Sequence, residues 1–421
     1  MARDRPTGVG RPERAALVGL IAGRARRQEA ERSLDELTGL AQAAGAEVVL
    51  RVLQERPKPD PSTFLGAGKI QTLAASAAET RVDVVIFDNE LTPAQQRQIE
   101  EEVGCKIVDR TQLILDIFAR RARTREGKLQ VELAQLKYLL PRLVGSSAAL
   151  SRLGGGIGTR GPGETKLETD RRRIRTRIHG ISGDIAQVRK RRSQLRERRH
   201  KASVPTVALV GYTNAGKTTL FNRLTRADAE VSNALFVTLD PLVRQLRLPD
   251  SRELLVSDTV GFIDRLPHAL VAAFRATLEE TGDADLVLHV IDASASDRDR
   301  RMNAVRQVLD EIGAVDVPLL EVYNKCDALT PGERHRLHDL DPSALCVSAL
   351  TGEGIDELVE TITSRLALDI CRVTLTFDPE DATDRERIAR LYRHGRVVLH
   401  ETRDGQASIV ADIPRRLLNR V

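Results

Sequence analysis

The sequence of 421 residues contains no tryptophan, 8 phenylalanines and 4 tyrosines, so aromatic residues make up only 3% of it. Its cores must therefore be aliphatic, and it has few aromatic rings on which single-stranded RNA bases could stack. The 4 cysteines form no CxxC pair, which excludes a disulfide framework or a zinc site. No membrane-spanning apolar run and no secretory signal occur. We expect a cytoplasmic protein, and partial association with the inner membrane face stays open.

Positive and negative charges are nearly balanced over the whole chain but not along it. The 65 basic residues exceed the 60 acidic ones by only 5. Residues 160–201, however, hold 15 basic and 5 acidic residues, a net charge of +10, which leaves −5 for the rest. A helix face needed only for solubility would mix the two signs. The imbalance favours nucleic-acid contact at this segment, although the high arginine content also fits codon bias.

The N-terminal part alternates buried strands with helices. Short apolar runs occur at 15–21, 47–53, 82–88 and 105–109, and helical stretches occur at 33–44, 67–80, 92–103 and 111–123. Such alternation predicts a parallel sheet with right-handed crossovers. The same alternation returns between 204 and 366, and residues 370–421 resemble a small strand–helix–strand–strand unit.

Between these parts lie two heptad patterns separated by glycines. The first is Leu129, Leu133, Leu136, Leu140 and Leu143; the second is Ile174, Ile178, Ile181, Ile185, Val188 and Leu195. Steps of three and four residues are typical of a helix with one apolar seam. We therefore predict an antiparallel helical hairpin with the glycine-rich segment 154–163 at its tip, far from the flanking domains.

A phosphate-binding loop stands between a predicted strand and a predicted helix. Its residues are Gly211, Tyr212, Thr213, Asn214, Ala215, Gly216, Lys217 and Thr218, which match GxxxxGK[ST]. In this pattern backbone amides surround the phosphates, the lysine reaches the β- and γ-phosphates, and the threonine hydroxyl binds Mg²⁺. A chance glycine-rich turn is the alternative, which the elements that follow in order make improbable.

Those elements indicate a guanine-nucleotide switch. We predict nucleotide contacts by the segments Phe236, Val237, Thr238, Leu239 and Asp240; Asp258, Thr259, Val260 and Gly261; Asn324, Lys325, Cys326 and Asp327; and Ser348, Ala349 and Leu350. Asp327 can accept hydrogen bonds from guanine N1 and N2, and the Ala349 N–H is predicted to reach guanine O6. Thr218 and Thr238 are the predicted metal ligands, with Asp258 acting through water. Lys217, Thr238, Gly261 and Asn214 are the predicted catalytic residues, since each is expected to act on the γ-phosphate directly or through a bound cation.

The residue after Gly261 is Phe262, where Ras-like proteins have a glutamine that orients the attacking water. Slow intrinsic hydrolysis is expected unless another group supplies the missing charge. We hypothesise that Asn214 holds a K⁺ ion near the phosphates; the alternative is that its side chain stabilises the loop.

The chain resembles the HflX family of ribosome-associated GTPases. The resemblance lies in GYTNAGKT (211–218), LFVTLDP (235–241), DTVGFIDRLPHALVAAFRATLEE (258–280), NKCD (324–327), SALTGEGID (348–356) and GGGIGTRGPGETKLETDRRRI (154–174). Leu242-Val243 departs from it, because the family usually has polar residues there. The resemblance implies an N-terminal α/β domain at 1–125, a basic helical hairpin with a glycine-rich tip at 126–203, a phosphate-loop GTPase domain at 204–366 and a small α+β domain at 367–421.

The resemblance also implies a function. It predicts a GTPase that uses Mg²⁺, converts GTP to GDP and phosphate, is stimulated by ribosomes, and binds the large ribosomal subunit and its rRNA as a monomer. GTP would drive the splitting or rescue of ribosomes stalled by heat or antibiotics. The alternative is a large-subunit assembly or anti-association factor whose GTPase times release. A small-molecule enzyme is disfavoured, since no second catalytic cluster is found.

Overall fold

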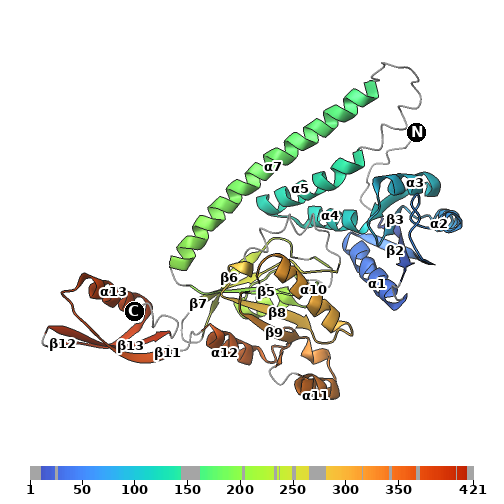
Figure 1. The fold of residues 1–421 in the computed structure, drawn as a ribbon. Coiled ribbons are helices and arrows are strands. Elements are labelled where there is room, and N and C mark those ends of the chain that lie inside the picture. The colour runs from blue at the N-terminus through green and yellow to red at the C-terminus, as the bar shows by residue number, and fades with distance from the viewer. Residues whose placement is uncertain are drawn as a thin grey trace.

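The computed structural model shows three sheets, the first two of which are joined by a long helical hairpin (Figure 1). It describes residues 11–23, 27–143, 162–201, 204–231, 235–236, 238–248, 253–264, 281–314, 316–340, 344–366, 370–403 and 405–414. Most of the predicted glycine-rich tip, residues 154–161, lies outside the described residues. Among the described helices, none has the length and apolar character needed to cross a membrane.

The first sheet is parallel, with strand order β2-β1-β3-β4. Its elements are β1 Glu13–Ala22, α1 Arg27–Ala43, β2 Ala46–Arg56, α2 Ala67–Glu79, β3 Val84–Phe87, α3 Pro93–Val103, β4 Lys106–Asp109 and α4 Arg110–Arg121. Alternate residues of β1 face two cores: Leu17 packs with α1 and α4, whereas Val18 packs with α2. Burial on both faces explains why the strands read as continuous apolar runs.

Local sequence signals set the helix ends in this sheet. Thr92 and Gln95 form a reciprocal capping box before α3, Pro93 occupies its first turn, and Gly104 ends it in the left-handed conformation at φ 76°. The predicted strand and helix positions are confirmed here to within a few residues, with α1 beginning earlier than predicted.

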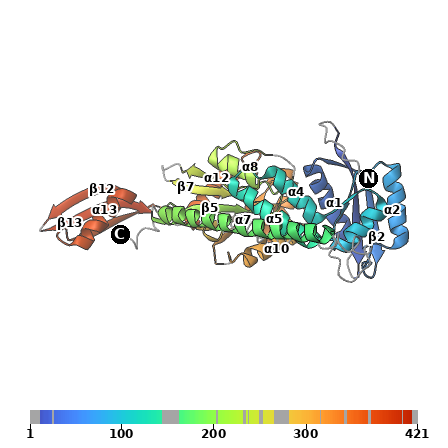
Figure 2. The same cartoon turned by 90° about the horizontal axis from the view of Figure 1, so that it is seen from above.

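The predicted hairpin is formed by α5 Arg125–Arg142 and α7 Pro162–Lys201. Figures 1 and 2 show α7 running alongside α5 and continuing beyond it. Leu133 of α5 packs against Ile181 and Ile185 of α7. The Arg177 guanidinium also binds the Glu132 carboxylate, with Nε–Oε1 2.7 Å. The apolar seam is thus confirmed along the middle of α5, while Leu195 carries no described side chain.

The central sheet has six strands in the order β10-β9-β8-β5-β7-β6. Its elements are β5 Thr206–Val210, α8 Lys217–Thr225, β6 Leu242–Arg247, β7 Glu253–Asp258, β8 Leu286–Asp292, α10 Arg298–Glu311, β9 Leu319–Asn324, a 3₁₀ turn Cys326–Ala328, α11 Pro331–Leu340, β10 Leu345–Cys346 and α12 Ile355–Arg365. All neighbours are parallel except β6, which pairs antiparallel with β7. Strand β6 was not predicted, and the unusual Leu242-Val243 pair forms its beginning.

The C-terminal unit is an antiparallel sheet of order β11-β13-β12 covered on one face by a helix. Its elements are β11 Ile370–Phe377, α13 Ala382–His394, β12 Arg396–Arg403 and β13 Gln406–Pro414. This is the predicted strand–helix–strand–strand unit. The three sheets fall within the ranges proposed for three of the four domains, and the α/β multidomain fold is confirmed.

Candidate guanine-nucleotide site

The phosphate-binding loop joins buried strand β5 to helix α8 at the carboxyl edge of the central sheet. Gly216 caps α8 in the left-handed conformation at φ 89°, and a Cβ there would lie 2.2 Å from the Asn324 side-chain nitrogen. Only glycine fits both demands. The loop therefore directs the free amides at the start of α8 toward one point, where an anionic phosphate is stabilised.

Lys217 lies beneath this loop and is 6% exposed. Its Nζ donates hydrogen bonds to the carbonyl oxygens of Gly211 and Tyr212, both at 3.0 Å. Burial lowers the pKa of Lys217 to about 8, while the charge of Asp258 acts in the opposite direction. The ammonium group is thus held by the loop, beside the place where the loop amides converge.

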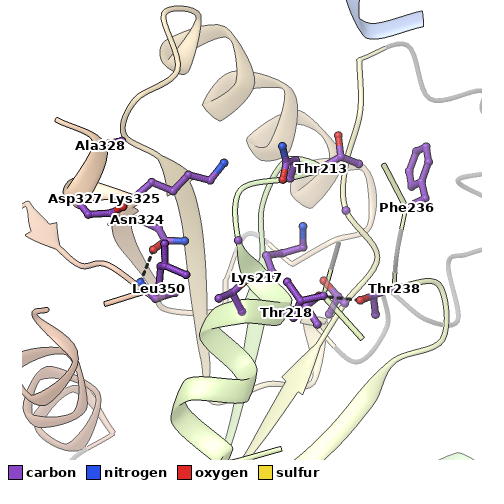
Figure 3. A pocket seen from close by; sticks show the side chains of 17 residues that line it. Thr213, Lys217, Thr218, Phe236, Thr238, Asn324, Lys325, Asp327, Ala328 and Leu350 are labelled. Carbon is purple, nitrogen blue, oxygen red and sulfur yellow. Dashed lines mark hydrogen bonds between the residues drawn. The ribbon is translucent and has the colours of Figure 1, made fainter. Parts of the chain in front are cut away.

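A cavity of about 340 Å³ opens over the loop (Figure 3). Fourteen of the predicted residues line it: Thr213, Asn214, Gly216, Lys217, Thr218, Phe236, Thr238, Thr259, Gly261, Asn324, Lys325, Asp327, Ala349 and Leu350. The structure therefore gathers separate sequence segments around one space. The prediction missed Thr219, Val231 and Ala328, of which the first and last directly follow predicted residues.

The other described residues of the prediction do not line the cavity. They are Gly211, Tyr212, Ala215, Leu239, Asp240, Asp258, Val260, Cys326 and Ser348. Leu239 and Val260 belong to the apolar core, and Cys326 belongs to a smaller core beside β9. Val237 lies outside the described residues.

Three oxygen-bearing side chains meet at one corner of the cavity. The Thr218 and Thr238 hydroxyl oxygens are 2.8 Å apart, and they lie 2.8 and 3.0 Å from Asp258 Oδ2. Asp258 is fully buried, and its Oδ1 has no hydrogen-bond partner in the described part of the chain. Burial raises the pKa of this carboxyl, opposed by Lys217 and the two hydroxyls. Hard oxygen ligands beside an unsatisfied carboxylate oxygen fit Mg²⁺, which keeps most of its ligands as water and phosphate.

At the opposite end of the cavity, Asn324 connects the phosphate loop to the predicted base-binding loop. Its side-chain amide donates to the Ala215 carbonyl at 2.8 Å, and its carbonyl accepts from the Ala349 N–H at 2.9 Å. The Ala349 N–H, which is predicted to bind guanine O6, therefore already donates to Asn324. A bound guanine O6 would have to share this donor with the Asn324 carbonyl. Lys325 binds Asp292 at 2.8 Å, and Asp327 is exposed on the cavity wall.

Comparisons with known proteins give family matches over most of the chain. Three family models match, described as "GTP-binding GTPase N-terminal" over residues 31–119, "GTP-binding GTPase Middle Region" over 121–199 and "50S ribosome-binding GTPase" over 206–325. GTPase HflX of Caldanaerobacter subterraneus subsp. tengcongensis is 45% identical over 423 residues, covering 100% of this chain and 94% of the relative. GTPase HflX of Escherichia coli (strain K12) is 47% identical over 383 residues, covering 90% and 89%.

The chain belongs to the HflX family of GTPases. It is therefore a GTP-hydrolysing enzyme with GTP as its substrate and, as is typical of GTPases, Mg²⁺ as its metal. The resemblance seen in the sequence motifs is confirmed.

In this HflX family member, the side chain of Phe262 does not line the nucleotide cavity. Its side chain is 2% exposed and packs in the core shared with the N-terminal sheet. Its backbone pairs with the phosphate loop, because its N–H donates to the Gly211 carbonyl at 3.1 Å and its carbonyl accepts from the Thr213 N–H at 2.7 Å. Phe262 thus fixes the spacing of the two loops and cannot orient a water molecule.

The N-terminal domain reaches the phosphate loop through a buried polar network that sequence reasoning missed. The Tyr212 hydroxyl donates to the Glu36 carboxylate and accepts from the Asp264 N–H at 2.8 Å. Arg110, 3% exposed, binds Glu36, Asp88 and the Asp264 carbonyl. Nothing in the local sequence around Glu36 or Arg110 signals this role, since the network exists only once two domains are packed together.

Proposed function

We propose that this HflX GTPase binds the large ribosomal subunit in the cytoplasm, as a monomer, and couples GTP binding and hydrolysis to the splitting or rescue of stalled ribosomes. The basic surface of α7 carries the proposal. Arg173 and Arg175 are 78% and 56% exposed at their side chains, and their carboxylate contacts are long, 3.7 and 3.8 Å. Such pairs stabilise little and are readily exchanged for phosphate. The match to a model described as "50S ribosome-binding GTPase" supports the same partner.

We assign the nucleotide roles by position in the cavity. Thr218 and Thr238 would bind Mg²⁺ directly and Asp258 would bind it through water; the metal would supply positive charge that offsets the charge of the phosphates. Lys217 and the loop amides hold the β- and γ-phosphates, and the Gly261 N–H detects the γ-phosphate. The exposed carboxylate of Asp327 recognises guanine, with Lys325 beside the base and Asn324 holding the two loops together.

Asn214 is assigned to a K⁺ ion that supplies positive charge near the phosphates. Its side chain is exposed, lines the cavity and makes no hydrogen bond to another described residue, which argues against the loop-stabilising alternative. GTP turnover should be faster in potassium than in sodium or choline buffer, and Asn214→Ala should remove the difference. Equal turnover of the unaltered protein in all three salts contradicts this assignment.

Sedimentation through sucrose gradients tests the ribosomal role. With a non-hydrolysable GTP analogue, the protein should migrate with the large subunit and reduce the peak of intact ribosomes. Association with free large subunits that leaves intact ribosomes unsplit favours the assembly or anti-association alternative. Absence of any association at low salt contradicts both.

A further inference from the structure

Residues Leu235, Phe236, Thr238, Leu239 and Asp240, called here the first switch, make contacts on two sides. Thr238 faces the corner of the nucleotide cavity where its hydroxyl meets the Thr218 hydroxyl and the Asp258 carboxylate (Figure 3). This corner is called here the metal corner. Two neighbours of Thr238 also pack against the N-terminal domain: Phe236, which lines the cavity as well, and Leu239 are each 3% exposed and belong to the core that contains α1 and α4. The position of Thr238 therefore depends on contacts made outside the nucleotide-binding domain.

Phe236 makes the first of these contacts. Its ring meets that of Phe118 on α4 edge to face, with centroids 4.6 Å apart and an interplanar angle of 78°. Its backbone is in the left-handed region at φ 58°, which is unfavourable for an aromatic residue. A strained conformation of this kind persists only where surrounding contacts fix it, and here the contact comes from α4.

Asp240 makes the second contact. Its Oδ2 accepts hydrogen bonds from the backbone N–H groups of Arg123 and Thr124, both at 2.8 Å. Its Oδ1 accepts from the Thr124 hydroxyl, and Thr124 caps α5 by accepting from the Gly127 N–H at 3.0 Å. The carboxylate thus lies at the positive end of α5, where negative charge is favourable.

We propose that Phe236 and Asp240 are positioning residues, through which α4 and the start of α5 hold the first switch with Thr238 at the metal corner. The Thr238 contact matters most when a γ-phosphate is present. Docking of the N-terminal part on the switch should therefore favour GTP over GDP, and by reciprocity GTP should favour docking. The inference rests on the proposed metal role of Thr238 and does not depend on ribosome binding.

Gly127 offers a way to break the contact without altering the switch. A Cβ added at Gly127 would lie 2.3 Å from Asp240 Oδ1, so Gly127→Ala must displace the carboxylate. Alanine is the better helix former, so α5 itself should not be weakened. Gly180→Ala on α7 is the matched control, because an added Cβ there meets nothing within 4 Å.

The experiment is equilibrium binding of fluorescent GDP and of a fluorescent non-hydrolysable GTP analogue, with Mg²⁺, to the full chain. Gly127→Ala and Asp240→Ala should each weaken analogue binding by about tenfold, within the usual range of coupling between sites. GDP binding should change by less than about twofold, and Gly180→Ala should match the unaltered protein. An unchanged ratio of analogue to GDP affinity in both folded variants overturns the proposal.

Hydrogen exchange on the unaltered chain gives an independent readout. The amides of Arg123 and Thr124, which donate to Asp240, should exchange more slowly with the GTP analogue than with GDP. The Gly127→Ala variant should lose this difference while keeping a cooperative thermal transition. Equal exchange with the two nucleotides in the unaltered protein also overturns the proposal, whatever the affinities are.

Discussion

The hydroxyl oxygens of Thr218 and Thr238 lie 2.8 Å apart although the residues come from different segments, and both contact the buried carboxylate of Asp258. Thr218 lies in the first turn of α8 and is fixed by its backbone, whereas Thr238 lies outside the described helices and strands. One hydroxyl of the metal corner therefore comes from a helix, and the other comes from the first switch.

Thr238→Val tests whether the Thr238 hydroxyl, which comes from the first switch, acts as a metal ligand. Valine keeps the shape of the side chain and removes the oxygen, so the GTP state alone is deprived of one metal ligand. We expect GTP turnover to fall by on the order of 10²-fold, the usual effect of removing one preorganised electrostatic contact. GDP affinity should stay within about twofold in a fluorescence titration. Thr361→Val, which removes a helix-surface hydroxyl on α12, should change neither quantity.

Asn324→Ala should lower nucleotide affinity and stability together. The change leaves the Ala215 carbonyl and the Ala349 N–H without their buried partner, and unsatisfied groups of this kind cost about 1–3 kcal/mol each. Denaturant unfolding should show the decrease in stability, and GDP and GTP should be weakened alike.

Asn222→Ala is the matched control for that change. Asn222 makes the same pair of bonds with the backbone of Ala229, at 2.7 and 3.0 Å, but does not line the cavity. It should lower stability and leave nucleotide affinity intact. An equal decrease of affinity in the two variants would mean that loop stability alone controls binding.

The sequence was enough to predict the site because the motifs are local. Gly211–Thr218, Asp258–Gly261 and Asn324–Asp327 each follow a buried strand, and parallel strands bring their carboxyl ends to one edge. Strand β6 was missed because it is an edge strand with two exposed residues in its middle, so its apolar pattern is weak. Contacts between domains, such as Tyr212 with Glu36, could not be predicted, since they depend on how two separately folded surfaces meet.

Asp327→Asn should change base preference rather than abolish binding. The carboxylate accepts from two guanine donors, whereas an amide presents a donor that suits the second carbonyl of xanthine. A site built on such a group can discriminate by ~10⁴. The variant should hydrolyse xanthosine triphosphate and no longer use GTP, with ATP inactive in both proteins. An unaltered preference for GTP in steady-state assays contradicts the assignment of Asp327.

Because His289 in β8 is buried, the free energy of unfolding should decrease as the pH falls below about 6.5. Burial, with help from Arg306 and Lys217, lowers the pKa of His289 to about 4, and its nearest carboxylate, Glu321, is already bound by Arg306. The unfolded chain takes up the proton near pH 6.5 and the folded chain does not. Stability is therefore complete above pH 6.5 and declines as the pH falls toward 4, by about 3 kcal/mol at most.

Denaturant titrations between pH 7 and 4.5 measure this effect, and most of the decline above about pH 5 comes before ordinary carboxylates titrate. His289→Leu should flatten the decline, because the titrating group is gone. His335→Gln is the control, since the His335 side chain is 80% exposed on α11. If His289→Leu follows the same pH curve as the unaltered protein, another group is responsible.

Replacing Arg171, Arg172 and Arg173 with alanine should weaken binding to the large subunit and leave nucleotide affinity unchanged. Removing one arginine–phosphate contact reduces the dependence of log affinity on log salt by nearly one, so the slope should fall by roughly three. Arg385, Arg387 and Arg390 on α13 provide a control with the same change in net charge, in the C-terminal unit and away from the N-terminal end of α7. The α13 variant should keep the original slope, because the proposed interface is a local basic surface. An equal reduction in both variants would show that overall charge, and not the hairpin, determines the attraction to rRNA.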